Sequence, residues 1–234
     1  MESKGRRRKA RAAAFAAAML LAALPAAAQT IGVAATVRNE VVQIARGATQ
    51  PIASGEAVVR NEVVRTGADS ATKLVFRDDT NLAVGPSATV TLDRFVFAGD
   101  DASASKVSVN LVRGAFRFTT GLSDKRAYEI STPVATVGVR GTIFDVLSVN
   151  GQTVVVLLDG ALTGCTKGGQ CRAISNPGDT LIITATGIRT TTTPGGPGGF
   201  SFAAYCGSDG LCSPTRYASS SPASGQIASA LCGR

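Results

Sequence analysis

Apolar residues in the middle of the chain occur in short runs that alternate with polar residues. In one run, polar side chains separate Val107, Val109 and Leu111. A period of two places alternate side chains on the same face of a strand. Val, Ile, Thr and Phe, which fill most of these runs, favour strands. No run between residues 29 and 188 keeps a 3.6-residue period over a helical length. We therefore predict an all-β body with many short strands in a sandwich- or solenoid-like fold.

One turn is indicated strongly. Asn150 and Gly151 stand between two apolar runs. An Asn-Gly pair in that position favours the type I′ turn of a β-hairpin. The pair therefore predicts a hairpin between the flanking strands.

A short segment occurs twice. Val37–Val42 reads Val-Arg-Asn-Glu-Val-Val, and Val59–Val64 has the same six residues after a period of 22. A period of this length fits stacked β units that bury their faces against each other. A duplicated hairpin, or chance, is the alternative, and the sequence leaves both open.

The first 28 residues differ from the rest. Six basic residues and one acidic residue stand before an apolar run at residues 12–24, and small residues follow Pro25. This order is typical of a secretory signal peptide, and the run is shorter than the roughly 20 residues of a membrane span. We expect a signal-peptide helix over residues 1–28, with cleavage between Ala28 and Gln29. The alternative is a retained membrane helix.

The charge balance changes once this segment is set aside. The chain carries a net charge of +8, and the first 28 residues contribute +5 of it. The mature chain then has too small a basic excess to indicate nucleic acid as a partner. It contains no further apolar run long enough to span a membrane. We expect an exported protein, periplasmic or extracellular, without a transmembrane segment in the mature chain.

The residues from 189 to 234 form a Gly/Pro/Ser-rich, loop-rich tail that carries three of the five cysteines. All five follow residue 164. Exported proteins commonly pair their cysteines. The candidate disulfides are Cys165 with Cys171 and Cys206 with Cys212, and Cys232 is left over or replaces one of the latter two. The five-residue spacing and the absence of histidine argue against zinc, so no metal or cofactor is expected.

The composition also excludes common catalytic chemistry. The chain has no histidine and no tryptophan, which removes the usual base of Ser/His and Cys/His catalysis. Glu129, Asp145 and Asp159 are acids that a glycoside hydrolase would need in a pair, but nothing fixes their separation. We predict a protein without catalytic residues and keep an envelope hydrolase as the weakest alternative.

The most distinctive stretch lies at residues 132–142. Its notable members are Thr132, Pro133, Ala135, Gly138, Val139, Arg140, Gly141 and Thr142. A proline starts a strand or lies at an edge, and glycines inside a strand pattern indicate a bulge or a close backbone approach. Arg140 would then project from a bent strand. It contacts an anion or a partner, or it ties loop carbonyls or a carboxylate such as Asp145 into the structure.

Three ordered motifs in this chain resemble those of the FecR domain family. The stretch at residues 132–142 is similar to the family's hallmark. Leu111–Phe118 is similar to its middle motif, and residues 66–86 to its earlier one. The resemblance covers residues 55–149 and weakly continues to 188, so we assign the FecR-like domain to residues 29–188. Asp79 stands where the family commonly has glycine, and aspartate tolerates the left-handed turn geometry.

The resemblance implies a recognition module rather than an enzyme. The name-giving members are inner-membrane regulators that connect an outer-membrane iron transporter to a cytoplasmic sigma factor. That relay needs a membrane span and a cytoplasmic segment, which we do not expect here after signal removal. We predict an exported, non-enzymatic protein-interaction or signal-sensing module of the bacterial cell envelope. Its partner is an envelope protein, bound by strand addition at an open edge near Val139. The alternative is a small-ligand or polysaccharide-binding envelope protein.

Overall fold

The computed structural model describes residues 29–97, 103–193 and 196–206, and nearly all their regular secondary structure is strand. The predicted signal peptide, Cys212 and Cys232 lie outside them. The strands are β1 (Thr30–Arg38), β2 (Val41–Ala45), β3 (Ala48–Pro51), β4 (Ala57–Val59), β5 (Val63–Thr66), β6 (Ala71–Phe76), β7 (Asn81–Val84), β8 (Thr89–Phe97), β9 (Ala104–Thr119), β10 (Tyr128–Ser131), β11 (Ala135–Val149), β12 (Gln152–Thr166), β13 (Cys171–Ile174), β14 (Thr180–Thr184) and β15 (Gly187–Thr191). A 3-10 turn (Gly196–Gly198) and helix α1 (Phe202–Cys206) follow. The all-β prediction is confirmed.

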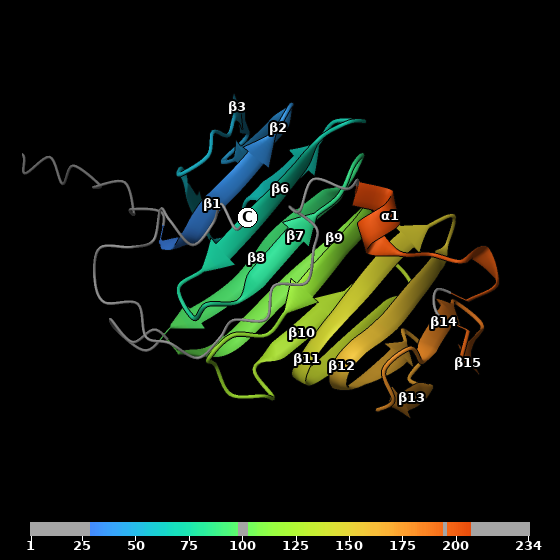
Figure 1. The fold of residues 1–234 in the computed structure, drawn as a ribbon. Coiled ribbons are helices and arrows are strands. Elements are labelled where there is room, and N and C mark those ends of the chain that lie inside the picture. Colours follow the sequence, from blue (N-terminus) through green and yellow to red (C-terminus); the bar gives the residue numbers. More distant parts are fainter. Residues whose placement is uncertain (1–28, 98–102, 194–195, 207–234) are drawn as a thin grey trace, which may run out of the picture.

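All fifteen strands belong to one hydrogen-bonded sheet that folds over into two layers (Figure 1). The first layer has the order β4-β1-β6-β7-β9-β11-β12-β14-β15. The second has the order β3-β2-β5-β8-β9-β10-β11-β12-β13. Neighbours are antiparallel except β9 and β10, which are parallel. Within the described residues, no helix is both long enough and apolar enough to cross a membrane.

Three long strands belong to both layers. β9 pairs with β8 up to Arg113 and with β11 from Gly114 onward. β11 and β12 pair with each other on both sides of a register shift near Gly141 and Gly160. All three glycines have positive φ, between 66° and 93°, a region that glycine enters without steric cost. These glycines are the corners at which the long strands pass from one layer to the other.

One hydrophobic core fills the space between the layers. Its members come from both, and most are completely buried. The rings of Phe76 in the first layer and Phe95 in the second lie 4.6 Å apart, centroid to centroid. Phe118 contacts Phe144 and Tyr128 at 5.5 and 5.8 Å. Aromatic pairs at these separations add packing energy beyond their buried area, so the aromatic side chains join the two layers.

The repeated segment forms the same corner twice. Asn39 and Asn61, at equivalent positions, both have left-handed φ, 56° and 65°. The strands before the two corners, β1 and β4, pair with each other, and so do the strands after them, β2 and β5. The repeat therefore marks two crossings of the chain from the first layer to the second. Asparagine is among the few non-glycine residues that adopt this conformation readily.

The predicted hairpin is also present. Asn150 and Gly151 connect β11 to β12 with φ values of 50° and 71°. Two positive φ angles are the signature of a type I′ turn, whose twist matches that of the flanking strands.

Candidate interaction surface

The family-like stretch at residues 132–142 lies in the middle of the sheet. Ala135, Val137 and Val139 point into the core, whereas Gly138 and Arg140 are exposed on the outer face of the second layer. β11 pairs with β10 and β12 in this half and with β9 and β12 in the other. Strand addition at Val139 is therefore wrong, because both sides of this strand are already hydrogen-bonded. Among the described strands, β3, β4, β13 and β15 pair along one side only.

Two buried threonines fix the ends of this stretch. The Thr132 hydroxyl accepts the amide of Ala135 at 2.9 Å and lies 2.7 Å from the Thr153 hydroxyl. The Thr142 hydroxyl donates to the carbonyl of Ala161 at 2.9 Å. Pro133 is exposed and precedes β11, where its missing amide leaves no ladder bond unmade. These residues hold the strand in register.

The two glycines of the stretch differ. Gly141 has φ +66° and lies at the register shift that forms the corner. A Cβ on the neighbouring corner residue, Gly160, would lie 2.1 Å from the Gly141 carbonyl oxygen. Gly138 sits in regular pairing, opposite Glu129, with open space where a Cβ would be. The predicted bulge is confirmed for Gly141 only.

Alanine substitution separates these roles. Gly141→Ala should lower the free energy of unfolding by about 1–2 kcal/mol, since an L-residue must adopt the left-handed conformation. Gly138→Ala should change it by less than about 0.5 kcal/mol, because the site is open and extended. Urea denaturation of both variants measures the difference. Equal losses would contradict the assignment of Gly141 as the corner.

Arg140 does not contact Asp145, contrary to one of the two roles predicted for it. Asp145 lies beyond the corner, on the outer face of the first layer, and forms a bidentate pair with Arg117 at 2.6 and 2.8 Å. Both members are buried, with Arg117 6% and Asp145 2% exposed. Among the described residues the Arg140 side chain has no hydrogen-bond or ion-pair partner.

Helix α1 covers the Arg117–Asp145 pair. Phe202 is completely buried, and its ring lies 5.6 Å from the Arg117 guanidinium carbon. The backbone of Phe202 also hydrogen-bonds the Asp145 carboxylate. Burial raises the pKa of Asp145, and the hydrogen bonds and charge of Arg117 partly oppose this. Figure 1 shows α1 lying across the outer face of the sheet, over β9.

The face beneath α1 is flat because its side chains are small. Ala71, Ala83 and Ala115, from β6, β7 and β9, form a cluster with Phe202 and Cys206. Bulkier side chains there would hold the helix away from the sheet. Nothing in the sequence pattern predicted this helix or its docking site.

A buried carboxylate organises the opposite end of the first layer. Asp78 is fully buried, and its Oδ2 accepts hydrogen bonds from Thr80, Ser123 and Tyr128 at 2.9, 2.6 and 2.9 Å. Burial raises the pKa of Tyr128, so its hydroxyl keeps the proton that it donates. Asp79 has φ +61°, as expected for an aspartate in a glycine position. The network fixes the β6–β7 turn to the loop before β10.

Residues 62–163 match the family model described as FecR protein. These residues form a FecR domain. The match begins at the second copy of the repeated segment and ends in β12. It includes all three corner glycines and the Asp78 network.

No curated protein matches this chain. Two crystal structures of a "putative anti-sigma factor" from Parabacteroides distasonis are similar at 13% and 14% identity, with TM-scores of 0.47 and 0.44. Each alignment covers 57% of this chain and 60% of the other. At these scores the likeness carries no argument about function.

The first residue of the FecR domain match is an unusual one. Glu62 is completely buried, and neither carboxylate oxygen has a hydrogen-bond partner among the described residues. Burial raises its pKa to about 7. The nearby backbone of Val59 lowers the pKa slightly, although it makes no hydrogen bond to either carboxylate oxygen. The equivalent residue of the first repeat, Glu40, is exposed, so the two copies of the corner differ in where the glutamate lies.

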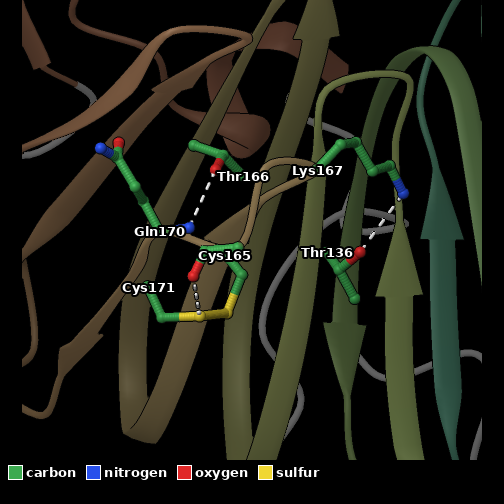
Figure 2. The surroundings of a disulfide bond; sticks show 7 residues. Thr136, Cys165, Thr166, Lys167, Gln170 and Cys171 are labelled. Carbon is green, nitrogen blue, oxygen red and sulfur yellow. Dashed lines mark hydrogen bonds between the residues drawn. A yellow bond between two sulfur atoms is a disulfide. The ribbon is translucent and has the colours of Figure 1, made fainter.

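A disulfide closes the edge of the second layer beside the FecR domain. Cys165 and Cys171 face each other on β12 and β13 and are bonded, as predicted (Figure 2). The backbone N–H of Gln170 donates to the Thr166 hydroxyl at 3.1 Å, and the Lys167 ammonium donates to the Thr136 hydroxyl of β11 at 3.3 Å. Cys206 is also disulfide-bonded; its predicted partner, Cys212, lies outside the described residues. The first bond fixes the short edge strand β13.

Removing this disulfide should have a moderate effect. Because the bond closes a loop of only a few residues, Cys165→Ser with Cys171→Ser should lower the free energy of unfolding by about 2 kcal/mol. Chemical denaturation under non-reducing conditions gives the value. An unchanged midpoint would mean that β13 is held by its backbone pairing alone.

The acids considered for hydrolysis have different surroundings. Glu129 pairs with Lys106 at 2.9 Å on the outer face of the second layer. Asp145 is enclosed with Arg117 beneath α1, and Asp159 lies at the Gly160 corner. Among the described residues, no group of three or more potential metal ligands occurs.

Proposed function

We propose that this protein is an exported, non-enzymatic FecR-domain module that binds another protein of the bacterial cell envelope and serves in interaction or signal sensing. The observation that carries the proposal is the FecR domain at residues 62–163, because such domains occur in envelope regulators. The Cys165–Cys171 disulfide supports export, since disulfides persist in oxidising compartments. The signal-peptide pattern at residues 1–28 points the same way.

The structure suggests how such a module would work. The domain is stiffened by its aromatic core, the Asp78 network and the docked helix. A stiff scaffold presents its turns and edges to a partner with little ordering cost. Its exposed corners and hairpins are then the candidate contacts.

Two measurements test the proposal. The mature protein isolated from the envelope should have the intact mass of a chain that begins at Gln29. A C-terminally tagged protein, crosslinked in its native cells, should capture one dominant envelope protein over a tagged, unrelated exported control. Recovery of only the proteins that the control also captures would overturn the binding proposal. Saturable binding of a glycan or small molecule would then favour the ligand-binding alternative.

A further inference from the structure

A shallow hollow of about 90 Å³ lies at the end of the molecule marked by the Gly114 corner. Three segments meet there: Val112 and Arg113 of β9 before the corner, Pro133 in the β10–β11 connection, and the β11–β12 hairpin after Val149. Val112 and Val149 are 43% and 44% exposed. They thus belong to the few large apolar side chains that the described residues leave exposed, and both line this hollow.

The size of the hollow limits what it can accept. Small-molecule sites usually enclose roughly 300–1,000 Å³, several times the space available here. A volume of 90 Å³ corresponds to about three waters, at about 30 Å³ each, or to one aliphatic side chain. No aromatic residue lines it, although aromatic rings commonly supply the contact area for larger ligands.

The charge of the lining points to one kind of ligand. Arg113 is the only ionisable residue among those that line the hollow. It is exposed and has no side-chain hydrogen bond or ion pair among the described residues. A guanidinium at the rim of an apolar hollow is complementary to a carboxylate beside an apolar group.

We propose that this hollow binds a peptide segment of the partner protein in which an aliphatic side chain stands next to a carboxylate. The aliphatic group fills the space between Val112, Pro133 and Val149, and the carboxylate pairs with Arg113. The inference rests on the proposed function, and it adds the place and the chemistry of the contact.

Arg140 provides a matched control. Like Arg113 it is exposed, follows a valine and precedes a corner glycine. Gly114 pairs with Ser148, so the Gly114 and Gly141 corners lie seven residues apart along β11, roughly 24 Å at 3.4 Å a residue. Leu122, 70% exposed, lies in the loop bonded to Asp78 at the Gly141 end.

The experiment uses a photo-crosslinking amino acid, p-benzoylphenylalanine, at Val149 or at Leu122 of the full-length protein in its native cells. We expect crosslinks from Val149 to a single protein, at a peptide with an aliphatic residue next to an aspartate, a glutamate or the chain terminus. Arg113→Glu should reduce this capture at least tenfold, and Arg140→Glu less than twofold. Thermal unfolding of both variants checks that they fold.

The remaining outcomes separate the two proposals. Capture from Leu122 alone, or capture from Val149 that Arg113→Glu leaves unchanged, would overturn the hollow as the contact and leave partner binding intact. A glycan or small-molecule adduct at Val149 would also overturn the peptide assignment. Absence of a protein adduct from both positions, in cells where the tagged chain still captures its partner, would overturn the hollow alone. Loss of that capture as well would contradict the proposed function.

Discussion

Replacing Glu62 by glutamine should make the protein more stable above pH 7 and equally stable near pH 4. The Glu62 pKa is about 7 in the folded protein, against 4.5 ordinarily. The folded state therefore binds more protons than the unfolded state between these values, and the stability of the wild type falls as the pH rises through this range. With 1.36 kcal/mol for each pKa unit, the loss approaches about 3 kcal/mol. Glutamine cannot ionise, so the Glu62→Gln variant avoids this loss of stability.

The measurement is urea denaturation of the wild type and Glu62→Gln at pH 4.5 and pH 8. Glu40→Gln is the matched control, since Glu40 occupies the same place in the exposed copy of the repeat. It should stay within about 0.5 kcal/mol of the wild type at both pH values. If Glu62→Gln follows the wild type across the whole range, the carboxyl group is solvated or paired in the folded protein, which would contradict its unpartnered burial.

Replacing Asp145 by alanine should lower the free energy of unfolding by about 3–5 kcal/mol, because it leaves the buried Arg117 guanidinium without its partner. It also removes the acceptor for the backbone of Phe202, so α1 should dock less firmly. The pair as a whole is expected to contribute little to the free energy of unfolding, since the cost of removing both charges from water offsets their attraction. Arg117→Met with Asp145→Leu should therefore be close to the wild type.

Denaturation midpoints of the single and double variants measure the contrast. Limited proteolysis at residues 192–201 reports whether α1 remains docked. A double variant as unstable as Asp145→Ala would show that the pair itself, with its bidentate geometry, stabilises the protein. A single variant with near-wild-type stability would contradict its burial.

Local signals predicted the local parts of the fold. Asn150-Gly151 predicts its hairpin because the turn depends on φ angles that these two residues adopt readily. The repeat marks two corners because asparagine provides the same left-handed residue in both. The cysteine spacing predicts a cross-strand disulfide because six residues span a short strand-turn-strand connection.

Contacts that depend on how the layers fold over could not be predicted from local signals. Gly141 turns β11 into the other layer, so Arg140 and Asp145 lie on opposite outer faces although only four residues separate them. Nearness in the sequence suggests a pair that does not exist, and even an unbent strand would direct side chains five positions apart to opposite faces. The actual partner, Arg117, lies directly opposite Asp145 on β9, a register that depends on the complete sheet.

The docked helix was missed for a similar reason. Five residues carry no helical period, and α1 is held by Phe202 against alanines from three strands. Each of these alanines is unremarkable in its own strand. Only the completed sheet brings them together as a flat site for a ring.

In-cell crosslinking of the tagged protein tests the central claim, that this FecR-domain protein functions by binding another envelope protein. We predict one dominant protein, recovered in an amount comparable to the tagged chain itself and absent from the exported control. Recovery of only abundant envelope proteins, in the same proportions as in the control, would contradict it.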